Sequence, residues 1–193
     1  VYANVWDNIW EWGVGDRAYR LANAGYQVVL SHGTHLYFDH PYEAHPEERG
    51  YYWAARFTDV AKVFGYMPDD LYANADKTRE GKVIEDLEVL LGKELPKLEK
   101  PENILGIQGQ IWTETIRTPQ QLEQMLYPRL LALAERAWHK ADWEGAEPDT
   151  ESRQQDWQRF GWTLTQKELP RLAEAGVASV SYTHLTLPTT PYV

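Results

Sequence analysis

The stretch Gln27-Val-Val-Leu-Ser31 is a continuous apolar run, and Tyr37 and Asp39 follow it in the sequence. Short apolar runs of this kind are typical of strands that are buried on both faces of a parallel sheet. Two other segments repeat the pattern: Val1 to Trp6 ends at Trp6-Asp7, and Asn103-Ile-Leu-Gly-Ile-Gln-Gly-Gln-Ile-Trp112 ends at Trp112 and Glu114. Because the carboxyl ends of parallel strands meet at one end of a sheet, these aromatic and acidic side chains are predicted to share one pocket.

Helical patterns separate the strands. Asp16 and Gly25 have the positions of an N-cap and a C′ residue, and Thr118-Pro119-Gln120-Gln121 is typical of a capping box with Pro at N1. The predicted helices run from Asp16 to Ala24, from Tyr51 to Val63 after an acidic turn at Pro46-Glu-Glu, from Glu80 to Leu91, from Pro119 to Ala137 with a kink at Pro128, and from about Asp156 to Ala175.

Strands alternating with helices at this spacing indicate an α/β fold with a parallel sheet. Three strands alone do not make a stable open sheet, whereas a TIM (β/α)₈ barrel needs eight strands and about 250 residues. The chain has 193 residues. We therefore predict the C-terminal portion of such a barrel, consisting of about three strands with their helices.

Composition excludes several classes of protein. The formal net charge of −10 and the lack of a Lys/Arg run argue against nucleic acid as a partner. No apolar stretch approaches the length of a transmembrane helix, so no membrane segment is expected. The absence of Cys removes disulfides and thiolate zinc sites, and the oligomeric state is left open.

Histidines and glycines give only weak signals for a metal or a cofactor. The spacing of His32, His35, His40 and His45 matches no zincin motif, and Gly13-Val-Gly15 lacks the third glycine of a dinucleotide fingerprint. We predict neither a metal site nor a cofactor.

The aromatic composition points instead to carbohydrate. Nine Trp and twelve Tyr stand against four Phe, a bias toward rings that carry a polar group. The C–H faces of a sugar stack on indole, and its hydroxyls donate to carboxylates. Other interpretations stay open for each residue: Trp6 and Trp112 as core aromatics at strand ends, Tyr37 and Asp39 as an ordinary turn, and Glu114 as a carboxylate bonded to a backbone amide.

Five strings in the same order resemble glycoside hydrolase family 20, and in particular its bacterial β-N-acetylhexosaminidases of the chitobiase type. They are Asn4-Val-Trp-Asp-Asn8, Leu36-Tyr-Phe-Asp-His-Pro-Tyr-Glu43, Glu48-Arg-Gly-Tyr-Tyr-Trp53, Gly109-Gln-Ile-Trp-Thr-Glu-Thr115 and Tyr127-Pro-Arg-Leu-Leu-Ala-Leu-Ala-Glu-Arg-Ala-Trp-His139. The resemblance covers residues 1–178, which we assign to the C-terminal part of the catalytic barrel. From Ala175 to Val193 the sequence contains no Lys, Arg, Asp or Glu. We interpret residues 179–193 as a non-native or unstructured tail. A genuine edge strand or linker is the alternative.

The resemblance implies substrate-assisted retaining hydrolysis, in which the 2-acetamido oxygen of the substrate attacks the anomeric carbon. In this family an adjacent Asp-Glu pair supplies the orienting carboxylate and the general acid. No Asp-Glu dipeptide occurs in the 193 residues, so we expect the pair on an earlier part of the barrel.

The remaining wall of the pocket can be matched residue by residue. Tyr37 matches the catalytic tyrosine that holds the acetamido oxygen. Asp39 and Glu114 match acceptors for sugar hydroxyls, Trp6 and Trp112 match tryptophans that enclose the acetamido group and the ring, and Trp53 matches an aromatic under the next sugar. Asp7 is a weaker candidate behind Trp6. Glu135-Arg136 lies within a predicted helix and is interpreted as a buried, structural ion-pair network.

The partner implied is an oligosaccharide that contains N-acetylhexosamine, with terminal β-linked GlcNAc or GalNAc. The resemblance favours a periplasmic or secreted protein. Two other functions remain open: a non-catalytic carbohydrate-binding module, which would display its Trp residues on a flat face, and a structural fragment whose aromatics serve core packing.

Overall fold

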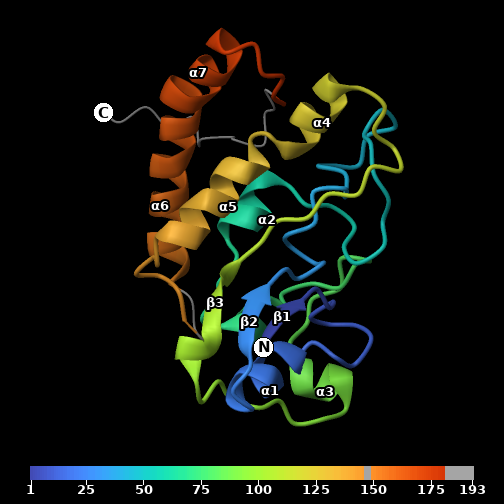
Figure 1. Cartoon of the computed structure of the whole chain (residues 1–193), viewed down its shortest axis with the longest axis vertical. Coiled ribbons are helices and arrows are strands. Elements are labelled where there is room, and N and C mark those ends of the chain that lie inside the picture. Colours follow the sequence, from blue (N-terminus) through green and yellow to red (C-terminus); the bar gives the residue numbers. More distant parts are fainter. Residues whose placement is uncertain (146–148, 181–193) are drawn as a thin grey trace.

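A parallel sheet lies at the centre of the chain. The structure, a computed structural model, describes residues 1–145 and 149–180. Strands β1 (Tyr2–Val5), β2 (Gln27–Leu30) and β3 (Ile104–Ile107) pair in parallel in the order β1-β2-β3 (Figure 1). The three predicted strands and their common direction are confirmed.

Helices connect and flank these strands. α1 has Asp16 as its N-cap residue and is followed by Gly25 at a φ of +90°. α4 has Pro119 at its first position, and the Thr118 side chain accepts a hydrogen bond from the Gln121 N–H at 3.2 Å, as the sequence predicts. The described helices are α1 (Arg17–Asn23), α2 (Val60–Phe64), α3 (Leu87–Leu91), α4 (Pro119–Leu126), α5 (Arg129–Trp138), α6 (Thr150–Thr163) and α7 (Leu169–Glu174), with 3₁₀ turns at Leu71–Asn74 and Pro101–Asn103.

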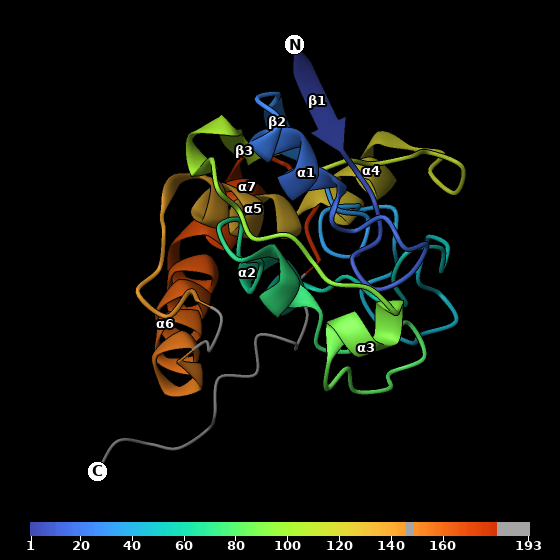
Figure 2. The same ribbon diagram turned by 90° about the horizontal axis from the view of Figure 1, so that it is seen from below.

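Two hydrophobic clusters hold the elements together. One joins β1, β2 and α1 through Val5, Ala18, Val28 and other buried residues. The other joins α2, α5 and α6, and Figure 1 shows α6 lying along the side of this pair. Figure 2 shows β1 at the margin of the molecule, with its N-terminal end projecting past the other elements. Among the described residues, β1 and β3 therefore each have one free strand edge.

The predicted helix from Tyr51 to Val63 is wrong over most of its length, since only Val60–Phe64 is helical. Backbone N–H groups that a helix would use are bound elsewhere: Tyr51 donates to Asp39 O at 3.3 Å and Thr58 donates to Pro41 O at 2.9 Å. These tertiary hydrogen bonds override the local helical pattern. They fold the segment back onto the chain that follows β2.

Three other helices differ from the prediction at their ends. The helix predicted from Glu80 begins at Leu87, because the preceding turn pairs Val83 with Lys77 in an antiparallel bridge. Pro128 separates α4 from α5 instead of kinking one helix, as its missing N–H allows. The last helix begins earlier than predicted, at Thr150 after the N-cap Asp149. It is continuous with α7 through a π-helical turn at Leu164–Glu168, just before Pro170.

A β-bulge alters β3 just before the predicted pocket. Val28 of β2 pairs with Ile104, but Val29 pairs with Gly106, so that two residues of β3 correspond to one step of β2. Gly106 has a φ of +151°, which L side chains rarely adopt. Because Leu105 is an extra residue in β3, the alternation of side chains between the two faces of the sheet is shifted by one residue after it.

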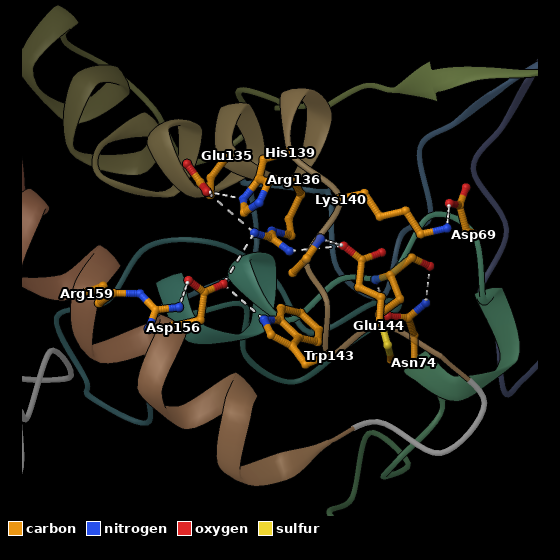
Figure 3. A network of polar contacts seen from close by, with 12 residues as sticks. Asp69, Asn74, Glu135, Arg136, His139, Lys140, Trp143, Glu144, Asp156 and Arg159 are labelled. Carbon is orange, nitrogen blue, oxygen red and sulfur yellow. Dashed lines mark hydrogen bonds and ion pairs between the residues drawn. The ribbon is translucent and has the colours of Figure 1, made fainter.

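Arg136 forms the buried network that the sequence predicts around Glu135-Arg136 (Figure 3). Its guanidinium is fully buried and lies 3.1 Å from Glu144 Oε1 and 4.0 Å from Asp156 Oδ2. Asp156 also accepts the indole N–H of Trp143 at 3.0 Å. This network joins α5 to α6 and contributes no side chain to the cavity described below.

Most of the predicted tail, residues 181–193, lies outside the described residues. Val180, the second residue of that tail, donates its backbone N–H to Tyr127 O at 3.2 Å and packs against the hydrophobic cluster around α5.

Candidate functional site: an aromatic and acidic cavity at the strand ends

A cavity of about 770 Å³ lies at the C-terminal ends of the strands. Its lining side chains are aromatic, amide or acidic. They are Asn4, Trp6, Tyr37, Asp39, Tyr51, Trp53, Gln110, Trp112 and Glu114. The structure thus brings all six predicted site residues into one cavity.

Every lining residue belongs to a pair spaced by two along the chain. Asn4 and Trp6 leave β1 in this way, and Gln110, Trp112 and Glu114 continue the direction of β3. Alternate residues of an extended chain point to the same side, so the residues that continue β1 and β3 present their side chains to the cavity together. This alternation was the available signal for Asn4 and Gln110, which the sequence interpretation missed together with Tyr51.

Asp39 and Trp53 form the closest contact within the cavity wall. The indole N–H of Trp53 donates to Asp39 Oδ2 at 2.8 Å, whereas Asp39 Oδ1 has no hydrogen-bond partner among the described residues. Burial raises the pKa of Asp39, although the Trp53 N–H acts in the opposite direction. One carboxylate oxygen is therefore held in place, and the other is buried without a hydrogen-bond partner among the described residues.

Tyr37 lies beside Asp39 and is almost completely buried. A parallel bridge pairs its backbone with Gln110, and its ring meets Trp53 edge to face at a centroid distance of 4.8 Å. Burial, and then the negative charge of Asp39, raise the pKa of Tyr37. The hydroxyl consequently stays protonated at neutral pH and can donate a hydrogen bond.

Trp6 and Trp112 are not core aromatics, because 49% and 58% of their surfaces are exposed. Trp6 contacts Trp12 edge to face, and Trp12 stacks on Trp53 at a centroid distance of 6.2 Å. Trp12 has a φ of +61°, an uncommon conformation for a bulky residue. The sequence interpretation did not single it out.

Asp7, the weaker candidate, lies behind the cavity wall. Its carboxylate is buried and forms an ion pair with Arg17 at 3.2 Å. Burial raises the pKa of Asp7, while the charge of Arg17 acts in the opposite direction. The contact with α1 indicates a structural role.

Polar side chains from the ends of all three strands are joined by hydrogen bonds. Asn4 donates to Ser31 Oγ at 3.2 Å and to Gln108 Oε1 at 3.1 Å, and Gln110 donates to the same serine oxygen at 3.4 Å. These hydrogen bonds fix the relative positions of the segments that leave β1, β2 and β3.

His32, His35 and His40 are buried, whereas His45 is exposed. His32 bonds Tyr66 at 2.7 Å and His35 bonds Thr34 at 2.9 Å. Within residues 1–145 and 149–180, no group of three His, Asp or Glu side chains has the arrangement of a metal site. The helices described here include none that is both long and apolar enough to cross a bilayer.

Burial of these histidines predicts acid lability. Burial lowers the pKa of His32 to about 3 and that of His40 to about 4, and the pKa of His35 also lies well below its usual value. Since the unfolded chain binds these protons first, stability is complete above about pH 6.5 and decreases as the pH falls. Between pH 7 and pH 5.5 we expect a loss of about 1 kcal/mol for each histidine.

Thermal denaturation of the full-length protein at pH 7 and pH 5.5 measures this loss. Carboxylates with ordinary pKa values titrate below this pH interval, whereas the raised pKa values of buried Asp7 and Asp39 add stability on acidification and offset part of the loss. His32→Asn is expected to remove about a third of the pH dependence, since three histidines share it. An unfolding midpoint that is the same at both pH values would contradict the prediction.

Residues 1–141 match the family model described as "Glycosyl hydrolase family 20, catalytic domain". The chain is 40% identical over 195 residues to a beta-hexosaminidase of Vibrio vulnificus, in a match that covers 90% of this chain and 22% of that protein. It is 41% identical over 187 residues to an N,N′-diacetylchitobiase of Vibrio harveyi, covering 90% of this chain and 20% of that protein. The chain therefore spans about a fifth of the length of these relatives.

Solved structures give the same fold. The GH20 β-N-acetylhexosaminidase of Streptomyces coelicolor A3(2) matches with a TM-score of 0.66 at 20% identity, over 98% of this chain and 30% of that one. The GH20 exo-β-N-acetylglucosaminidase of Vibrio harveyi, in complex with N-acetylglucosamine, matches with a TM-score of 0.58 at 23% identity, over 93% of this chain and 22% of that one. The three parallel strands and their helices are a portion of a TIM barrel.

Proposed function

Because the chain belongs to glycosyl hydrolase family 20, we propose that it supplies one wall of the sugar pocket of a β-N-acetylhexosaminidase. The substrate is an oligosaccharide or glycan that ends in β-linked GlcNAc or GalNAc. The observation that carries the proposal is the cavity at the strand ends, where aromatic faces and carboxylates alternate. We assign residues 1–178 to the catalytic barrel.

The proposed chemistry is substrate-assisted hydrolysis with retention of configuration. The acetamido oxygen forms a bond to the anomeric carbon while the glycosidic bond breaks, and the leaving oxygen takes a proton from a general acid. Water then opens the oxazolinium intermediate and restores the β-configuration. Residues 1–193 contain no Asp-Glu dipeptide in that order, so we propose that the acid and the orienting carboxylate come from another part of the full-length protein.

Each lining residue has a proposed role. Tyr37 donates its hydroxyl hydrogen to the acetamido oxygen and so fixes the nucleophile near the anomeric carbon. The Asp39 carboxylate, which the Trp53 N–H holds through Oδ2, accepts a hydrogen bond from a sugar hydroxyl. Trp6 and Trp112 enclose the ring and the acetamido group, and Trp53, together with the Trp12 ring that stacks on it, contacts the next sugar.

Glu114 is proposed to bind a hydroxyl at the O4 and O6 end of the sugar. Its carboxylate is exposed to the cavity and makes no ion pair or hydrogen bond with the other described residues. A free carboxylate at this position can accept from a sugar hydroxyl without first losing a protein partner.

The test uses the full-length protein and nitrophenyl-GlcNAc. We expect release of nitrophenol, and we expect Glu114→Gln to lower kcat/KM by about 10- to 100-fold through the loss of a charged hydrogen bond. The matched control is Glu102→Gln, an exposed carboxylate at the opposite end of β3, which should leave both constants unchanged. Binding of GlcNAc without any turnover would indicate the carbohydrate-binding module instead.

A further inference from the structure

Residues 39–58, which lie between β2 and α2, provide Asp39, Tyr51 and Trp53 to the cavity but contain no helix or strand. Such a segment needs specific contacts to hold three side chains in place. Gly50 allows the chain to pass close to the Asp39 carbonyl. Its φ is +109°, and a Cβ at this position would clash with Asp39 O. Two other residues, Arg129 and His40, each contact this segment at several points.

Arg129 ties the two ends of this segment together from α5. Its guanidinium is completely buried and donates to Phe38 O at 2.6 Å, His40 O at 2.8 Å and Thr58 O at 3.0 Å. It also donates to Met125 O at 2.9 Å through Nε. The carbonyls on both sides of Asp39 are therefore bound by one side chain.

His40 connects the start of the segment with the part that carries Trp53. Its Nε2 lies 3.3 Å from the N–H nitrogen of Ala54 and 3.2 Å from that of Ala55, and its Nδ1 lies 3.0 Å from Tyr37 O. Since two N–H groups point at Nε2, this nitrogen carries no proton, and Nδ1–H donates to the Tyr37 carbonyl. The imidazole is therefore neutral and in the Nδ1–H tautomer.

The same ring also supports Trp53 from one side. The imidazole of His40 stacks on the indole at a centroid distance of 5.0 Å and an interplanar angle of 18°. The edge of that indole donates to Asp39 Oδ2 at 2.8 Å. A rotation of Trp53 would break this hydrogen bond and release the carboxylate.

We propose that His40 is a positioning residue that, through its ring contacts with residues 37 and 53–55, fixes Trp53 and Asp39 for sugar binding. The inference rests on the proposed function. His40 touches no reacting atom. Because Asp39 and Trp53 would bind the sugar equally in the ground state and the transition state, disturbing them raises KM and leaves kcat nearly unchanged. A purely structural role would lower the amount of active protein without changing KM.

Two substitutions separate the two sides of the ring. His40→Asn keeps a donor near the position of Nδ1 but removes the acceptor for the N–H groups of Ala54 and Ala55. His40→Gln keeps an acceptor near the position of Nε2. In the full-length protein acting on nitrophenyl-GlcNAc, we expect KM to rise about tenfold for the Asn variant and less than about threefold for the Gln variant.

His32→Asn is the matched control. His32 is equally buried, but its ring bonds Tyr66 and contacts no cavity residue. It is expected to lower the unfolding temperature without changing KM. An unchanged KM in His40→Asn, or an equal rise in KM in His32→Asn, would overturn the proposal.

A spectroscopic readout is independent of catalysis and of whether the variants fold. In wild-type protein labelled with ¹⁵N-histidine, the signal of His40 should be that of an imidazole protonated at Nδ1 alone. An Nε2–H tautomer would refute the proposed arrangement. If the wild-type protein shows this tautomer but does not hydrolyse nitrophenyl-GlcNAc, the proposed function fails while the positioning contact stands.

Discussion

In the full-length enzyme, Tyr37→Phe is expected to lower kcat by about 10²–10³ with a smaller effect on KM. The substitution removes only the hydroxyl, which we propose to hold the acetamido oxygen as charge develops on it. The ring and its edge-to-face contact with Trp53 remain. Steady-state kinetics with nitrophenyl-GlcNAc measure the effect.

Tyr26→Phe provides the control for this substitution. Tyr26 immediately precedes β2, at the opposite end of the strand from the cavity, and its side chain is 41% exposed. Its loss of a hydroxyl should not change kcat. A Tyr37→Phe variant with wild-type kcat would show that the proposed role is wrong.

Residues 1–193 alone are expected to show no hydrolysis of nitrophenyl-GlcNAc. Without an adjacent Asp-Glu pair, the leaving oxygen has no general acid and the acetamido group has no orienting carboxylate. The isolated chain should also aggregate or lack a cooperative thermal transition. Within the described residues the sheet has three strands, and Tyr2 on the free edge of β1 is 74% exposed.

Two assays on the purified chain decide this prediction: release of nitrophenol, and thermal denaturation. Addition of the preceding part of the barrel, in one polypeptide, should restore both turnover and a cooperative transition. Turnover by residues 1–193 alone would mean that the chain contains its own acid, and Glu114 would be the first residue to replace.

Much of the fold was predictable because its signals are local. The apolar run Gln27–Leu30 and the segment Ile104–Ile107 identified their strands directly, and Thr118-Pro119 identified the start of α4. Tyr37 and Trp112 follow these strands in the sequence, and they were predicted to share a pocket because parallel strands end on one side of a sheet. These inferences depend on neighbours in sequence, which the sequence itself displays.

The segment from Tyr51 to Thr58 could not be predicted in this way. Its composition suits a helix, but its N–H groups bind Asp39 O, Pro41 O and the ring of His40. These partners lie more than ten residues away in sequence, so no local pattern reveals them.

The sequence by itself determined the strand positions, the parallel sheet and which six side chains to look for. Only the tertiary structure decided that Trp53 holds one oxygen of Asp39, and that His40 and Arg129 fix the segment carrying both. The physical reason is that strands follow from local side-chain patterns, whereas a segment without helix or strand takes its shape from hydrogen bonds to distant residues.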